Sequence, residues 1–160
     1  MKETANYLRQ TIAFLRPHLE NISDENATIK PAPHKWSKKE IIGHLIDSAC
    51  NNQQKFVRTM ALPHLDFVGY AQDFWVDVQR YNAYDWGNLV RLWSIYNEHI
   101  AHIIEYVNPE KLSNTISIDG SQPFTLQFIM QDYVEHIKHH MKVVLPDVAI
   151  ESKFENVYSA

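Results

Sequence analysis

Apolar residues recur every three or four positions over long stretches of this chain, which is the pattern of amphipathic helices. Glycines, of which there are only four, seldom interrupt the pattern. It predicts four long helices with these limits: Thr4 to about Ile22, Ser37 as N-cap to about Met60, Asp85 as N-cap to Asn108-Pro109, and Thr125 as N-cap to Leu145. Joined by long connectors, these helices predict an all-α four-helix bundle that forms a single domain over residues 1–160.

The second of these helices has the clearest start signal. Ser37 is a good N-cap residue, and Glu40 stands three positions later, where it can complete a capping box. Trp36 is placed to pack onto Ile41 across the cap. In the first helix, Pro17 is expected to cause a kink or a restart, because proline lacks the amide that an interior helical position donates.

The connectors carry weaker signals. Ser23 to His34, a segment with two prolines, is expected to be a connector between the first two helices. The aromatic-rich stretch from Pro63 to Tyr84 has room for a short helix through Phe74, Trp75 and Val78. Residues 116–120 are typical of a short extended loop or hairpin, and the pattern leaves little room for strands elsewhere.

Charge and cysteine content exclude several classes of protein. The formal net charge is −4, and the lysines and arginines are scattered, so nucleic-acid binding is disfavoured. No stretch approaches the roughly 18 apolar residues of a membrane span, and we expect no membrane partner. The single cysteine, Cys50, excludes an intrachain disulfide and a multi-cysteine metal site, which favours a reducing compartment. We therefore expect a cytoplasmic protein.

Two histidines stand four residues apart in the last predicted helix. His136 and His140 lie at the edge of its apolar stripe, on one face, whereas His139 faces water. At this spacing two imidazoles can share a metal ion. The alternative is that both are residues at the edge of the core, bonded to water or to carboxylates, and spacing alone does not decide.

A third candidate ligand, His44, lies on a polar strip of the second helix. Its companions there are Ser48, Asn51 and Lys55, and Asp47 stands one turn on. The strip could be solvated surface or could line a polar cleft between helices. Periodicity taken alone favours the surface.

Two motifs together resemble the DinB-like superfamily. The first runs from Lys35 to Ser48 and contains Trp-Ser-x-x-Glu followed by His-Leu-x-Asp-Ser, and the second is His-x-x-His-His at residues 136–140. The resemblance extends from about Pro31 to Leu145 and includes the YfiT-like metal hydrolases and related thiol-dependent S-transferases. It implies a four-helix bundle, often dimeric, in which His44, His136 and His140 bind a metal ion. YfiT-like relatives often carry a histidine at the position of Asn97, and some relatives carry one at the position of Val143. These differences concern substrate handling more than metal binding.

Three imidazole ligands leave positions open for a reactant, which is typical of catalytic sites. Zinc is the first expectation for the divalent metal and nickel the second. The ion could activate water for hydrolysis or hold a low-molecular-weight thiol as thiolate for transfer to a small molecule. Asp47 is a candidate acceptor or base beside His44.

A second hypothesis is a non-catalytic bundle that binds metal or an apolar ligand and dimerises. An open metal position beneath a pocket favours the enzyme, and a site closed by a fourth side chain or sealed by aromatic residues favours the binding protein. His99 and His102, three residues apart on the third helix, are candidates for such a fourth ligand or for a hydrogen bond to the substrate, and the alternative is that they are partly exposed or bonded to a neighbour. For either hypothesis we expect a homodimer.

Overall fold

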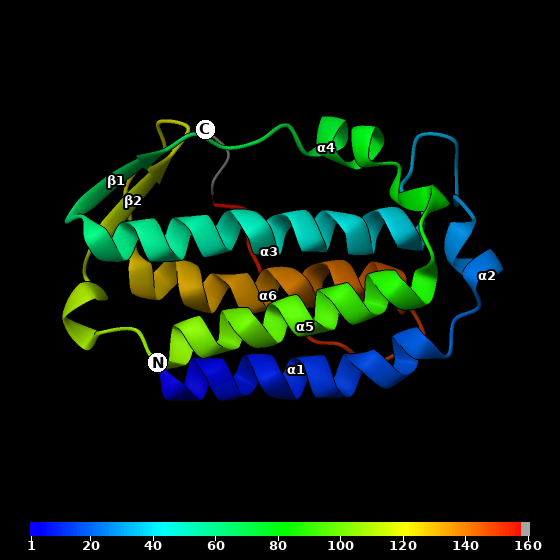
Figure 1. Ribbon diagram of the computed structural model, residues 1–160, viewed down its shortest axis with the longest axis horizontal. Coiled ribbons are helices and arrows are strands. Elements are labelled where there is room, and N and C mark those ends of the chain that lie inside the picture. Colours follow the sequence, from blue (N-terminus) through cyan, green and yellow to red (C-terminus); the bar gives the residue numbers. More distant parts are fainter. Residues whose placement is uncertain (158–160) are drawn as a thin grey trace.

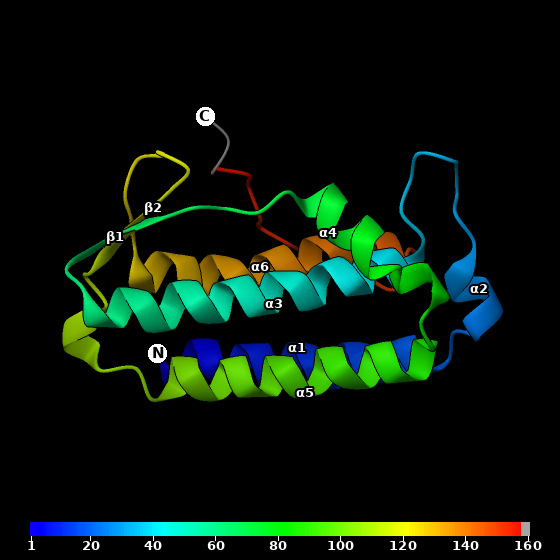
Figure 2. The same ribbon diagram turned by 45° about the horizontal axis from the view of Figure 1, so that its top comes forward.

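Four long helices run side by side in residues 1–157, the part of the chain that the computed structural model describes (Figure 1). Viewed after a 45° turn, α3 and α6 form one layer and α1 and α5 the other (Figure 2). The arrangement buries the apolar stripe of each helix against the others. The bundle is formed by α1 (Lys2–Glu20), α3 (Lys38–Ala61), α5 (Trp86–Glu105) and α6 (Leu126–Val144).

Three of the four predicted helix starts are confirmed by their capping hydrogen bonds, whereas α1 begins at Lys2, before the predicted Thr4, and has no side-chain cap. At the start of α3 the Ser37 hydroxyl accepts from the backbone N–H of Glu40, while the Glu40 carboxylate accepts from the backbone N–H of Ser37. The side chains of Asp85 and Thr125 accept in the same way at the starts of α5 and α6. These bonds satisfy amides that have no partner inside the helix.

Of the two alternatives expected at Pro17, the restart is wrong: α1 continues through it, since only one hydrogen bond near the end of the helix is lost there. Two further details of the helices differ from the sequence prediction. The connector that follows contains a short helix, α2 (Asp24–Thr28), which Ser23 caps through the N–H of Asn26. α5 ends at Glu105, earlier than predicted.

A small sheet corrects the strictly all-α prediction. β1 (His64–Phe67) pairs in parallel with β2 (Thr115–Ile118), and β2 pairs antiparallel with β3 (Phe124–Thr125). The sheet lies at the end of the bundle where α3 ends and α6 begins (Figure 1). Each strand is too short for an alternating pattern to be recognised, and the parallel partners are far apart in the sequence.

The segment between β1 and α5 covers an additional side of α3. It contains α4 (Gln72–Gln79), the expected short helix, and the 3-10 turn η1 (Tyr81–Ala83), while a second such turn, η2 (Pro109–Lys111), follows α5. The backbone of α3 approaches this segment closely at Gly43, where a Cβ would lie 2.1 Å from Cδ2 of Tyr81. Glycine is therefore required for the approach.

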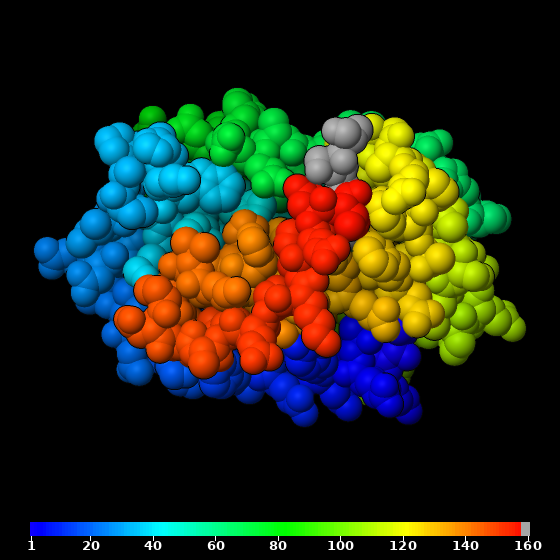
Figure 3. Space-filling model, turned by 180° about the vertical axis from the view of Figure 1, so that it is seen from behind, coloured from blue at the N-terminus to red at the C-terminus, as the bar shows by residue number. Residues whose placement is uncertain are grey.

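The chain beyond α6 lies across the outer surface of that helix, where it is red in Figure 3. The Ser152 hydroxyl donates to the carbonyl of Glu135 at 2.8 Å, and the N–H of Lys153 donates to the Glu135 carboxylate at 2.7 Å. These bonds bring Phe154 against α6. None of the helices that the structure describes is both long and apolar enough to cross a membrane.

Candidate metal centre

His44 lies in the interior of the protein and not on its surface. Its side chain is 1% exposed, because the polar strip of α3 faces α6 and a pocket between the two helices. The interpretation of this strip as solvated surface is therefore wrong. A helical wheel places a residue on a face, but it does not show which other element covers that face.

The structure brings His44 together with His136 and His140. One ring nitrogen from each histidine lies within 4.8 Å of the corresponding nitrogens of the other two. The ring centroids of His44 and His140 are 4.7 Å apart, and Nε2 of His140 lies 3.1 Å from Nε2 of His136. The two helices supply these rings because α3 and α6 pack against each other along their length (Figure 2).

The His44 ring in this cluster lacks hydrogen-bond partners within the described structure. Neither Nδ1 nor Nε2 of the buried His44 ring has a hydrogen-bond partner among residues 1–157. Buried polar atoms without partners are costly and rare in folded proteins. The Trp36 ring packs against His44 with centroids 5.1 Å apart, which holds the imidazole in place without satisfying it. The donor set and its unpaired nitrogens fit a divalent metal ion.

Burial keeps these imidazoles neutral. It lowers the pKa of His44 from 6.5 to about 4 and that of His140 to about 3. The pKa of His136 is also well below its usual value, first because of burial and then because of the neighbouring His140. A neutral imidazole retains the lone pair that a metal ligand needs.

Asp47 lies one turn from His44, but its hydrogen bonds lead elsewhere. Its Oδ1 accepts from the hydroxyl of Tyr81 at 2.7 Å and from the amide of Gln79 at 2.8 Å. Its Oδ2 is buried without a hydrogen-bond partner in the described part of the chain. Burial raises the pKa of this carboxyl group, although both hydrogen bonds oppose the shift. The carboxyl group is not part of the histidine cluster.

A pocket of about 570 Å³ opens from the histidine cluster. α3 and α6 form its floor, and loops next to the sheet together with the C-terminal segment form its walls. The three histidines lie among the lining residues, so the cluster is accessible to a small molecule. The pocket combines polar groups with the apolar ring of Phe154, whose centroid is 5.1 Å from that of His136.

The other candidate residues do not join the cluster. His99 and His102 are exposed on α5, and Nε2 of His99 lies 3.4 Å from the amide nitrogen of Gln53. His139 is exposed and forms part of the pocket wall. Cys50 is a half-buried free thiol. Asn97 belongs to the core, where its Oδ1 accepts from the hydroxyl of Tyr133 at 2.6 Å.

Several pocket residues were not identified from the sequence. Tyr70 belongs to the aromatic stretch before α5, whose density is equally consistent with core packing, a dimer contact or a lid over a pocket, and the structure places Tyr70 in the pocket lining. Asp132 stands one turn before His136, and this spacing could have indicated it. Phe154 and Asn156 follow the last helix in a segment without any periodic pattern.

Comparison with known proteins places the chain in a family. A model described as the DinB superfamily matches residues 7–144. The chain belongs to the DinB superfamily. The resemblance inferred from the two motifs is thereby confirmed. No curated protein gives a significant match to this DinB chain.

A solved structure with the same fold is that of YfiT from Bacillus subtilis, described as a probable metal-dependent hydrolase with an unusual four-helix bundle topology. The TM-score is 0.81 at 16% sequence identity, and the match covers 90% of this chain and 83% of YfiT. At this identity the likeness shows the fold alone. It supports the helical bundle, and the chemistry follows from the residues of the site.

Proposed function

We propose that this DinB-superfamily protein is a metal-dependent enzyme that acts on a small molecule. In this proposal His44, His136 and His140 bind one divalent cation, with zinc as the first candidate and nickel as the second. The reaction is either hydrolysis or the transfer of a low-molecular-weight thiol. The observation that carries the proposal is the group of three neutral imidazoles, with nitrogens within 4.8 Å of one another, at the end of an open pocket.

The composition of the site favours an enzyme over a closed binding protein. Among the described residues, no fourth histidine, cysteine, aspartate or glutamate joins the group. Structural zinc sites are normally closed by four protein ligands, whereas catalytic sites keep a position open. Bound by three imidazoles, a divalent cation supplies Lewis acidity, which lowers the pKa of water to about 7 or stabilises a thiolate.

The chain's own residues orient the site. The Trp36 ring fixes the plane of His44, and the Phe154 ring lies against His136 and excludes water from that side. We assign to Asp47, which stands one turn after His44 on α3, the role of a proton acceptor or donor. Its buried, unpartnered Oδ2 and its raised pKa support this assignment, because groups that move protons near neutral pH typically have such surroundings.

Elemental analysis of protein purified without an affinity tag tests the ligand set. We expect close to one equivalent of zinc or nickel in the wild type and a large loss in His44→Ala, His136→Ala and His140→Ala. The exposed His99→Ala and His102→Ala variants are matched controls and should retain the metal. Full metal occupancy in the three site variants would rule out the proposed ligands.

Activity is tested separately, with the metal-loaded protein. Panels of esters, amides and thiol acceptors should show turnover that a chelator abolishes and that added metal restores. Asp47→Asn is expected to lower kcat while the metal content stays unchanged. A homodimer and a cytoplasmic location remain predictions, which light scattering and fractionation of cells would test.

A further inference from the structure

The pocket has two ends, which the antiparallel helices α3 and α6 define. α3 ends beside the sheet, whereas α6 begins there (Figure 1). His44 therefore lies opposite His140 at one end, and from there the pocket-lining face of α3 continues through Ser48 and Asn52 to Lys55. Eleven residues of α-helix correspond to a rise of about 16 Å, so the histidines and Lys55 mark opposite ends of an elongated pocket.

Lys55 is an ammonium group without a hydrogen-bond partner. In residues 1–157 its Nζ has neither a hydrogen-bond acceptor nor a salt bridge, and it lies 5.5 Å from the centroid of the Phe67 ring. Asp119 and Asp132 attract it electrostatically without forming an ion pair. The Asp119 carboxylate instead accepts from the backbone N–H of Gly69 at 2.8 Å.

An unpaired ammonium in such a place favours an anionic ligand. The Lys55 side chain is half-buried, so its charged group has lost part of its water, and an opposite charge with hydrogen-bond acceptors can offset that cost. Burial lowers the pKa of Lys55 to about 8, and the attraction of Asp119 and Asp132 opposes this shift, so the group stays mostly protonated at pH 7. With a divalent cation at the histidine end, the positive charge in the pocket would exceed that of the two carboxylates.

We propose that the substrate is an elongated small molecule whose carboxylate or phosphate group binds Lys55 while its reactive part lies at the histidine end. This inference rests on the proposed function, because the histidine cluster gives the pocket its reactive end. It adds a substrate class and a binding residue. Lys55 then anchors the substrate and takes no part in the chemistry.

Three ligands of equal chain length test the anchor: hexanoate, hexyl phosphate and the uncharged hexanamide. Titration calorimetry is carried out with the full chain, both metal-loaded and in the presence of EDTA. We expect at least one of the anions to bind, more weakly in EDTA than with metal, because without the cation Lys55 alone opposes the two carboxylates. Lys55→Met should weaken the binding in both forms by about tenfold or more, the usual range for a charge-assisted hydrogen bond. Lys55→Arg should retain most of the affinity.

The controls separate this proposal from the proposed function. Lys2→Met, which changes an exposed lysine of α1, should leave anion binding unchanged, and hexanamide should not distinguish Lys55→Met from the wild type. Equal anion affinities for the wild type and Lys55→Met, or no anion binding at all, would overturn the anchor. If the proposed function is wrong and the histidines bind no metal, elemental analysis will show this. The difference in anion affinity between the wild type and Lys55→Met in EDTA will then still be observed.

A measurement on the unaltered chain covers the case in which Lys55→Met does not fold. Acetic anhydride labels accessible lysines, and mass spectrometry determines the extent of labelling at each one. Saturating hexanoate or hexyl phosphate should slow the labelling of Lys55 severalfold and leave that of Lys2 unchanged. Equal labelling of Lys55 with and without both anions would contradict the proposal.

Discussion

Two polar clusters lie on neighbouring residues of α6, and they differ in whether the protein satisfies them. Glu135 and Lys138 form the first, which faces α1 and the C-terminal segment. His136 and His140 belong to the second, which faces α3 and the pocket. These two turns of α6 thus carry both clusters. Protein groups satisfy the charges of Glu135 and Lys138, whereas the nitrogens of the histidine cluster have few protein partners.

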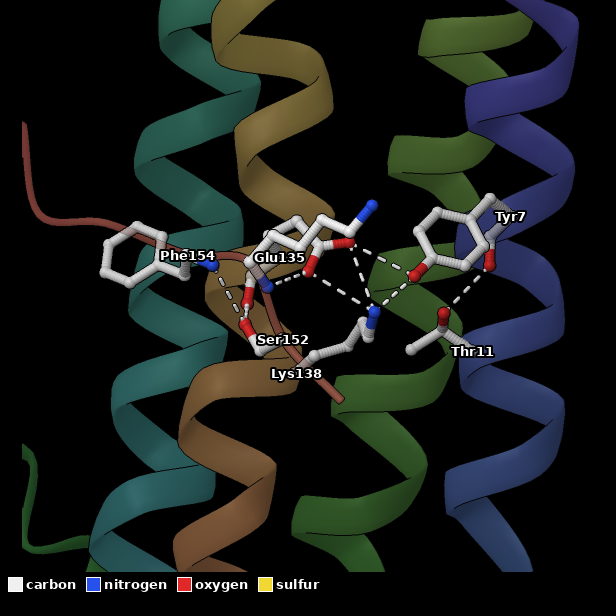
Figure 4. Close-up of polar contacts among 7 residues, drawn as sticks. Tyr7, Thr11, Glu135, Lys138, Ser152 and Phe154 are labelled. Carbon is white, nitrogen blue, oxygen red and sulfur yellow. Dashed lines mark hydrogen bonds and ion pairs between the residues drawn. The ribbon is translucent and has the colours of Figure 1, made fainter. Parts of the chain in front are cut away.

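In the first cluster each charged group has several partners (Figure 4). The Glu135 carboxylate accepts from the hydroxyl of Tyr7 at 3.1 Å, from Lys138 at 3.2 Å and from the backbone N–H of Lys153 at 2.7 Å. Lys138 also donates to the Tyr7 hydroxyl. Burial raises the pKa of Glu135, but the bonds from Lys153, Lys138 and Tyr7 outweigh this effect and lower it.

The contrast indicates what each cluster does. The Glu135 cluster joins α1, α6 and the C-terminal segment, so it stabilises the fold. In the histidine cluster both buried ring nitrogens of His44 have no partner within the described chain, so this cluster gains stability when a ligand binds. Changes to the first should alter folding, and changes to the second should alter binding.

The largest expected effect is that of metal on stability. Free zinc at 1,000 times its Kd should raise the free energy of unfolding by about 4 kcal/mol, because only the folded chain brings the three imidazoles together. His140→Ala should lose this increment, while Lys138→Met should retain it. Urea denaturation with and without EDTA measures both. An equal increment in His140→Ala would remove the distinction between the clusters.

Glu135→Gln should have the largest effect on the metal-free fold. We expect a decrease of about 1–3 kcal/mol in the free energy of unfolding, since Lys138 and the Lys153 amide lose a charged acceptor. The exposed Glu155→Gln is the matched control and should change stability by less than about 0.5 kcal/mol. The metal content should be unchanged in both variants. A loss of metal from Glu135→Gln would show that the clusters are coupled.

The two clusters should also affect the stability of the metal-free protein in different pH ranges. Between pH 6.5 and about 4 the unfolded chain protonates His44 while the metal-free folded chain does not. The free energy of unfolding should therefore decrease as the pH is lowered through this window. The decrease is at most about 1.4 kcal/mol per pH unit for each such histidine.

His44→Phe should flatten this slope. The contribution of Glu135 belongs to a lower window: its pKa is below the usual 4.5, so its stabilisation is present above pH 4.5 and is lost as the pH falls through the lowered value. Denaturation curves at intervals of half a pH unit measure both windows. A stability that is constant from pH 6.5 to 4.5 in the metal-free wild type would contradict the assignment.

The smallest effect is expected at the segment that touches both clusters. Ser152→Ala removes the bond to the Glu135 carbonyl and the acceptor for the N–H of Phe154, so about 1 kcal/mol should be lost. Trypsin should then cleave faster after Lys153, because the segment lifts away from α6 more often. Ser113→Ala, an exposed control, should leave the cleavage rate unchanged. Unaltered cleavage in Ser152→Ala would show that other contacts hold the segment.

Local signals account for the parts of the fold that the sequence predicted correctly. The starts of α3, α5 and α6 follow from Ser37, Asp85 and Thr125, since each cap bonds to an amide only three residues away. The short helix α2 was missed because five residues are too few for a periodic pattern, although Ser23 was a visible cap. The sheet was missed because its parallel pairing joins residues about fifty positions apart, such as Leu65 and Ile116.

The sequence by itself determined the long helices. It also determined that His136 and His140 lie on one face of the last helix, because helix periodicity is a local property that relates residues one turn apart. Only the tertiary structure decided that His44 is buried, that Lys55 lies in the same pocket, and that Phe154 returns to cover α6. The burial of a polar strip depends on which element covers it. That choice is made by packing between segments distant in the chain, and no single helix contains the information.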